Sequence, residues 1–341
     1  MIYVATNKGL GLQECKGNFV IKGRVNGVEK DQFYRELTTK TGRDMRMVSF
    51  GVEYSKGKTV YVSLNGMERD NVYFSAKVDG KNVVETVPWT QRKTFNKEGF
   101  KIIGVNLGLA KIRTEKGDLV NNKCVLTEYD ACKYIADNLK DDMSVFIKGK
   151  MEFSEYNGKH MIRYIPSQIS LCMDIDFDSD RFEPMNMFEQ QICFMGINKT
   201  DNGEFAIDAK VIGYNSVEDA ELFLTNNLLA KNLRGLKPYT AISVGGSIEV
   251  IHDVLNEEDD DGWGYNPMAQ LKNPTVRRLF VTGADPQTID TTIYNEEDIE
   301  AAIAKLNSAK AAKSDYGSSS ENDWGENNKI EESNDSEDDW D

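Results

Sequence analysis

Cationic and aromatic side chains alternate in the segment PWTQRKTFNKEGFK, residues 88–101. Trp89 and Phe95 stand close to Arg92 and Lys93. Aromatic faces stack on planar bases, and ammonium or guanidinium groups neutralise phosphates, so this combination is typical of surfaces that bind a nucleic-acid strand. The segment therefore predicts part of a strand-binding surface.

The first half of the chain repeats these residue types on segments that we expect to be strands. The cations are Lys22, Arg24, Arg46, Lys148, Lys150, Lys159 and Arg163, and the aromatics are Tyr61, Phe153, Tyr156 and Tyr164. Each residue alone has an ordinary explanation too, because aromatics fill cores and Lys and Arg cover most surfaces. Together with Trp89, Arg92, Lys93 and Phe95, they predict a DNA-binding face in the first half of the chain.

Charge is distributed very unevenly along the chain. The 341 residues carry a formal net charge of −15. Residues 1–170 contain 28 Lys and Arg against 20 Asp and Glu, whereas residues 315–341 contain 1 against 11. A basic first half suits a polyanionic ligand, so the overall acidity does not argue against one.

The acidic end, ENDWGENNKIEESNDSEDDWD, contains two of the four tryptophans. It has too few aliphatic residues to fold alone, so we expect a disordered tail. A tail that only confers solubility needs no Trp, whereas an aromatic anchor among acids suits a basic, apolar groove on a partner. The predicted partner-binding residues are Trp324, Asp338, Asp339, Trp340 and Asp341.

Few residues could perform catalysis or hold a metal. The two histidines, His160 and His252, are far apart, and the five cysteines form no CxxC pair, so zinc is not expected. Residues 174–180, DIDFDSD, resemble the start of a calcium loop, but Ser179 and Met185 occupy the positions of its Gly and Glu. No nucleotide-binding or hydrolase motif occurs. We expect no enzymatic activity, cofactor or metal; a metal nuclease with carboxylates converging in the basic half is the open alternative.

The sequence contains no run of 18 apolar residues and begins without a signal-peptide pattern. We therefore expect no membrane partner and a cytoplasmic location.

Alternation and turn residues predict a mainly β fold. In the first half we expect strands at residues 18–25, 46–54, 58–67 and 144–171, the last span divided by a turn at Asn157–Gly158. Residues 127–140 predict a helix that Thr127 caps. Between these lies a segment with a hairpin at Asp79–Gly80 and a strand at 100–109.

The second half repeats a shorter form of this order. We expect strands at residues 191–198, 203–214, 239–254 and 276–284, with an acidic loop at 256–268. Residues 216–229 predict a helix capped by Ser216, and residues 296–310 predict a final helix capped by Asn295.

Five short antiparallel strands with a helix before the fourth are typical of the OB-fold, a Greek-key barrel, and this order occurs twice. The expected domains are residues 1–171 as the first barrel with an insertion at about 68–126, 172–189 as an acidic linker, 190–295 as the second barrel, 296–312 as a helix and 313–341 as the tail.

Over residues 17–171 the sequence resembles the single-stranded DNA-binding protein (SSB) family in a tandem, phage-type form. The resemblance is carried by VIKGRV (20–25), YDACKYIADNL (129–139), VFIKGKME (145–152) and YNGK (156–159), and by the acidic tail. The tail departs from the family in one detail, because Asp341 follows the aromatic Trp340.

The resemblance implies a protein that binds and protects single-stranded DNA without sequence specificity in phage DNA replication, recombination or repair. It also implies that the tail competes with DNA and recruits replication proteins such as a polymerase, helicase or primase, in the host cytoplasm. Oligomeric state stays open. The alternatives are a phage structural or protein–protein scaffold module built on OB-like barrels, and a protein that binds or anneals RNA.

Overall fold

Five strands of the first half close into a barrel in the computed structural model, which describes residues 9–115, 117–156, 159–252 and 275–315. They are β1 (Gly17–Asn26), β3 (Asp44–Ser55), β4 (Lys58–Met67), β10 (Ser144–Tyr156) and β11 (Lys159–Leu171). Around the barrel the order is β1–β3–β4–β11–β10 and back to β1, and only the contact of β4 with β11 is parallel. Helix α1 (Glu128–Asn138) separates the third and fourth barrel strands in sequence. This arrangement is an OB-fold, as the sequence predicted.

A second barrel repeats the same topology. Its strands are β12 (Met185–Lys199), β13 (Phe205–Ile212), β14 (Val217–Leu224), β15 (Thr240–His252) and β16 (Thr275–Asp290). The order β12–β13–β14–β16–β15 closes on β12, with β14 and β16 parallel. Helix α2 (Asn227–Arg234) again precedes the fourth strand. The mainly β, two-barrel fold class is confirmed.

The prediction of one helix over residues 216–229 is wrong. Residues 217–224 form β14, with Ala220, Leu222 and Leu224 buried at every second position. The apolar residues of this segment fit both the two-residue period of a strand and the 3.6-residue period of a helix. Pairing with β13 along the whole length of the segment favours the strand. The helix begins later, where the side chain of Asn226 accepts hydrogen bonds from the backbone N–H groups of residues 228 and 229.

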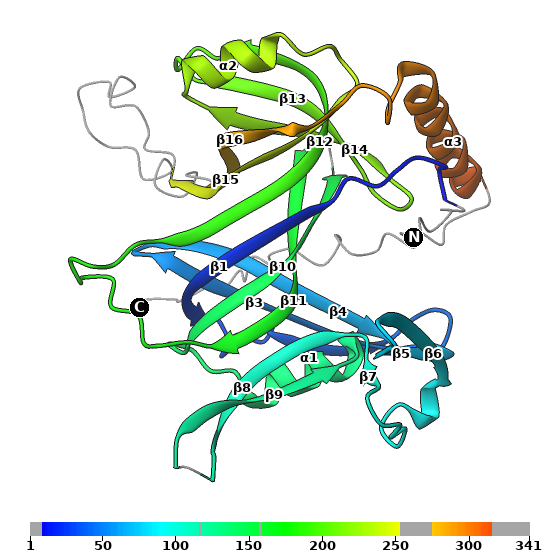
Figure 1. Cartoon of the computed structure of the whole chain (residues 1–341), viewed down its shortest axis with the longest axis vertical. Coiled ribbons are helices and arrows are strands. Elements are labelled where there is room, and N and C mark those ends of the chain that lie inside the picture. Colours follow the sequence, from blue (N-terminus) through cyan, green and yellow to red (C-terminus); the bar gives the residue numbers. More distant parts are fainter. Residues whose placement is uncertain (1–8, 116, 157–158, 253–274, 316–341) are drawn as a thin grey trace, which may run out of the picture.

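The barrels join edge to edge through their first strands. β1 and β12 pair antiparallel, with Phe19 opposite Phe188, and the result is one thirteen-stranded sheet with a core common to both barrels. Strand β10 contacts β14 and, reciprocally, β15 contacts β4, so the barrels are related by an approximate two-fold axis. In Figure 1 the second barrel lies above the first. β12 begins at Met185, within the span expected to be a linker.

The insertion in the first barrel is also β-rich. It contains β5 (Asn71–Val78), β6 (Lys81–Pro88), the short helix η1 (Trp89–Gln91), β7 (Lys101–Ile102), β8 (Val105–Arg113) and β9 (Leu119–Leu126). β5, β6 and β7 form a separate sheet with its own small core, whereas β8 extends the main sheet beside β11. Asp79 and Gly80 both have positive φ, which confirms the predicted tight hairpin. A further short strand, β2 (Tyr34–Thr38), pairs with β3.

Two of the three predicted helix caps, Thr127 and Asn295, are present, whereas Ser216 precedes a strand. Thr127 accepts a hydrogen bond from the N–H of Asp130 at 3.2 Å and begins α1. Asn295 accepts one from the N–H of Asp298 at 2.9 Å and begins α3 (Glu296–Asp315). Within the described ranges, no helix is long and apolar enough to cross a membrane. The turn at 157–158, the loop at 256–268 and residues 316–341 lie outside the described residues.

Candidate nucleic-acid interface

Three lysines lie close together on the outer face of β1 and β10. Val20 stands opposite Lys148 and Lys22 opposite Phe146, so Lys22 and Lys148 are diagonal neighbours on that face. Lys150 projects on the same side, two residues further along β10. In the described part of the chain, none of these lysines forms an ion pair. We call Lys22, Lys148 and Lys150 the basic face.

The second barrel carries the opposite charge on the outer face of β13 and β14. Asp208 stands opposite Glu221, and Lys210 stands opposite Asp219. The ammonium of Lys210 lies 2.7 Å from the Asp219 carboxylate, so its charge is already neutralised. This face repels a phosphate backbone, whereas the basic face attracts one.

Three predicted arginines bind other parts of the protein. Arg24 donates from Nε to the carbonyl of Ile175 at 2.9 Å. Arg46 pairs with Glu36 at 3.1 Å and lies over the ring of Tyr129, 4.0 Å from its centroid. Arg163, on β11, lies 2.9 Å from a carboxylate oxygen of Glu152 on β10. Arg46 and Arg163 are therefore paired with carboxylates, whereas the charge of Arg24 has no carboxylate partner among the described residues.

Of the four insertion residues predicted to bind DNA, three pack within the protein and one is exposed. The Arg92 guanidinium lies 4.1 Å from the centre of the Trp89 ring and bonds Asp130 from Nε at 2.7 Å. Phe95 packs on the small core of the insertion. Lys93 is the exposed member of the four, with 71% of its side chain exposed, and its ammonium pairs with Asp130 at 3.6 Å.

Asp130 is ionised in this environment. Burial opposes its charge, but hydrogen bonds from Arg92 and Thr127 outweigh burial and lower the pKa of this carboxyl below its usual value. The pair Arg92–Asp130 attaches the insertion to the start of α1.

Two aromatics assigned to the surface are in the core, and their assignment as binding residues is corrected. Tyr164 is 2% exposed and meets Phe19 edge to face at 5.2 Å, and Phe153 is 7% exposed. Both occupy inward positions of β11 and β10, where the closed barrel needs large side chains. The side chains of seven predicted residues lie outside the part of the chain that the structure describes. They are Tyr156 and Lys159, and Trp324, Asp338, Asp339, Trp340 and Asp341 of the tail.

Tyr61 is exposed as predicted, and the second barrel supplies a neighbour that the sequence did not reveal. Tyr61 lies on the outer face of β4 with 48% of its surface exposed. The Arg277 guanidinium, on β16, lies 4.9 Å from the centre of the Tyr61 ring. The sequence signal for this contact is weak. In VRRLF, Arg277 and Arg278 are successive residues of a strand, so their side chains face opposite sides and one of them can point away from its own barrel.

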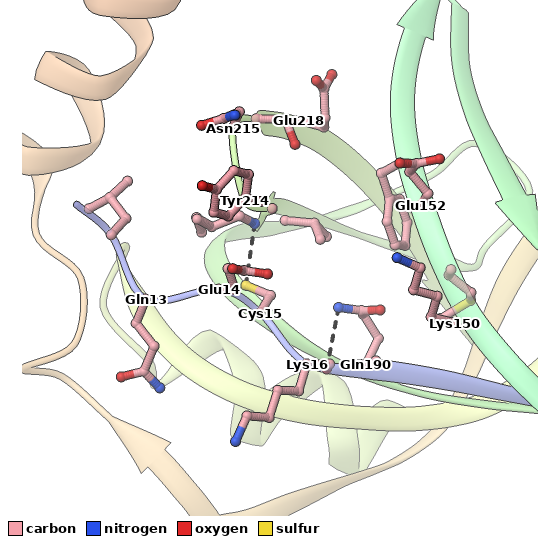
Figure 2. Close-up of a pocket in the computed structure, with 18 of the residues that line it drawn as sticks. Gln13, Glu14, Cys15, Lys16, Lys150, Glu152, Gln190, Tyr214, Asn215 and Glu218 are labelled. Carbon is pink, nitrogen blue, oxygen red and sulfur yellow. Dashed lines mark hydrogen bonds between the residues drawn. The ribbon is translucent and has the colours of Figure 1, made fainter. Parts of the chain in front are cut away.

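A cleft of about 1090 Å³ lies between the barrels. The segment from Gly11 to Gly17 forms one wall, and Lys150 and Glu152 of β10 face Tyr214 of the second barrel across it (Figure 2). Lys150 thus lies where the basic face meets the cleft.

Burial disfavours the thiolate form of Cys15, Cys132 and Cys193. Cys15 lines the cleft, where burial raises its pKa above the usual value, and its Sγ lies 3.3 Å from the hydroxyl of Tyr294. Burial raises the pKa of Cys132 and of Cys193 to about 12. These three thiols are therefore protonated at neutral pH. Across the residues that the structure describes, no three His, Cys, Asp or Glu side chains group in a way that could hold a metal ion.

Two closed OB barrels joined through their first strands define a tandem OB-fold protein. The chain belongs to the YorF family, whose model matches residues 75–319. No curated protein matches the sequence. Among solved structures it is similar to the wild-type single-stranded DNA binding protein from Thermus aquaticus, at 10% identity and a TM-score of 0.38, over 80% of this chain and 93% of that one. A deletion mutant of that protein gives 9% identity, a TM-score of 0.38 and coverage of 80% and 94%.

Proposed function

We propose that this protein binds single-stranded DNA without sequence specificity, through the first barrel. The observation that carries the proposal is the basic face, three lysines on adjacent strands of a closed OB barrel with no carboxylate partner among the described residues. OB barrels that bind single strands combine such a cationic track with exposed aromatic rings. The exposed ring of Tyr61 supplies the second element.

The track and the ring lie on one continuous surface. Lys150 on β10 stands opposite Ile165 on β11, and Tyr164 on β11 stands opposite Val62 on β4. Lys150 and Tyr61 therefore project outward from strands that are two spacings apart, about 10 Å. A strand that contacts the basic face can reach the Tyr61 ring within one or two nucleotides.

The salt dependence of binding tests the basic face. Each phosphate contact on a single strand contributes about 0.7 to the slope of log affinity against log salt. Replacing Lys22, Lys148 and Lys150 with Ala should therefore reduce that slope by about 2, measured by fluorescence anisotropy with a labelled oligothymidylate. The matched control is Lys231→Ala with Lys237→Ala, because both lysines are exposed near α2 of the second barrel. An unchanged slope in the triple variant would contradict the proposed interface.

The same assay separates DNA binding from the other candidate functions. The proposal requires the oligothymidylate to bind more tightly than a duplex of equal length or an RNA of equivalent sequence. Equal affinity for single strands and duplex would favour the scaffold function, and tighter binding of RNA would favour an RNA-binding or annealing protein.

The acidic tail and the second barrel complete the proposal. The tail would compete weakly with DNA for the basic face and, once displaced, recruit replication proteins such as a polymerase, helicase or primase through Trp324 and Trp340. The second barrel would serve mainly in packing and self-association, since its β13–β14 face is acidic. A role in phage DNA replication, recombination or repair, in the host cytoplasm, follows from this proposal and is part of it.

A further inference from the structure

Arg277 is unlike its neighbour Arg278, although both lie on β16. Arg278 bonds Glu204 at 2.6 Å and Glu249 at 3.0 Å, and only 17% of its side chain is exposed. Arg277 has no carboxylate partner among the described residues. Its positive charge is therefore available to an outside anion.

Arg277 is fixed against the first barrel. Its Nε donates to the carbonyl of Thr59 on β4 at 3.2 Å, and its guanidinium lies near one side of the Tyr61 ring. On the next strand, the N–H of Val250 donates to the hydroxyl of Tyr54 at 3.3 Å. These contacts between the barrels hold the guanidinium in place before any ligand arrives.

Tyr61 has room for a second ring. It is 48% exposed although Arg277 lies beside it. Its partner on β3 is Gly51, and the next outward pair is Ser49 with Ser63, so no large side chain on these strands stands over the ring. A nucleobase is flat and apolar on its faces, which suits an exposed aromatic ring whose other side meets a cation.

We propose that Tyr61 of the first barrel and Arg277 of the second form one composite site for a nucleotide of the bound strand. The base stacks on the exposed part of the Tyr61 ring, and the adjacent phosphate contacts the guanidinium of Arg277. The inference rests on the proposed function and adds that the second barrel, despite its acidity, contributes a binding residue. Binding then depends on how the two barrels are joined.

The test measures oligothymidylate binding by anisotropy for Tyr61→Ala, Tyr61→Phe, Arg277→Ala, Arg277→Lys and the double Ala variant. Loss of one stacked base should weaken binding about 5- to 150-fold in Tyr61→Ala, and Tyr61→Phe should restore most of the affinity. Arg277→Ala should weaken binding and reduce the salt slope by about 0.7, and Arg277→Lys should keep that slope. The two losses should be less than additive in the double variant.

Tyr73→Ala is the matched control, because Tyr73 on β5 is 47% exposed but lies in the insertion. A second readout needs no substitution. An oligothymidylate with one 5-iodouracil, irradiated on the wild-type protein, should crosslink to Tyr61, which mass spectrometry of the peptides would identify.

Two results would overturn the composite site without contradicting the basic face. One is an affinity within twofold of wild type for both Tyr61→Ala and Arg277→Ala, and the other is a set of crosslinks that all lie away from Tyr61. A wild-type protein that binds no single strand would instead overturn the proposed function itself.

Discussion

At the scale of single residues, Asp130 links charge to stability. Its folded pKa lies below the usual value, so the ionised form stabilises the fold above the unfolded-state pKa of about 4 and loses this effect as the pH falls through the folded value. Only 11% of its side chain and 14% of that of Arg92 are exposed, so water hardly screens the pair. The pair joins the insertion to α1 beside the edge-to-face contact of Trp89 with Tyr129, whose ring centroids lie 5.7 Å apart.

We expect Arg92→Ala to lower the free energy of unfolding by about 3 kcal/mol at neutral pH, because Asp130 would remain buried without its main partner. The exposed neighbour Lys93 provides the control, since Lys93→Ala should change the free energy of unfolding by less than about 0.5 kcal/mol. Thermal unfolding followed by circular dichroism measures both. The stability difference between wild type and Asp130→Asn should also narrow below about pH 4, and a difference that is the same at pH 3 and pH 7 would contradict this role.

The residue scale also shows what the sequence could and could not predict. Residue types predicted surface positions for Lys148, Lys150 and Tyr61, and all three side chains are exposed. They did not separate these from Tyr164, because a tyrosine inside a barrel and one outside it differ only by one position of strand register. Contacts such as that of Arg277 with Tyr61 join residues more than 200 positions apart, and no local pattern reports them.

At the scale of elements, α1 packs closely on β4 at Gly66. A Cβ at Gly66 would lie 2.1 Å from the backbone nitrogen of Tyr129, in the first turn of α1. Any side chain there must push the helix away from the barrel. The helix carries Asp130 and the ring that lies under Arg46, so its displacement would disturb both contacts.

Gly66→Ala should therefore lower the free energy of unfolding by about 1–3 kcal/mol or more, the usual cost of overpacking. Gly283→Ala on β16 is the matched control and should be nearly neutral, because no atom lies within 4 Å of its added Cβ and its φ is not positive. Urea unfolding of both variants compares them. Equal midpoints would show that the helix tolerates the side chain.

Element prediction from sequence succeeded where local signals agreed. The Thr127 cap, the Asp79–Gly80 turn and the alternation of β1 each pointed to one structure. It failed at β14, since residues 217–224 fit strand and helix periods equally and pairing with β13 decided the outcome. β9 was missed for a related reason, because the polar run Asn121–Lys123 interrupts its alternation and none of its residues is buried.

At the scale of the whole molecule, charge separates into a basic first barrel and an acidic second half. Deleting residues 316–341 should tighten oligothymidylate binding at low salt, because the proposed competitor is removed. The gain should shrink as ionic strength rises and the Debye length falls to about 8 Å or less. Anisotropy titrations at several salt concentrations measure it. Unchanged or weaker binding at low salt would contradict competition by the tail.

The approximate two-fold axis through the β1–β12 pair relates barrels that differ in chemistry. Two identical barrels around such an axis would offer the same surface to a strand laid in either direction. Here one side offers the basic face and Tyr61, and the other offers Asp208 and Glu221. Under the proposed function, a strand running 5′ to 3′ across this molecule would meet its charges in a different order from a strand running 3′ to 5′. Joining two unlike barrels in one chain therefore removes the equivalence of the two strand directions that two identical barrels would have.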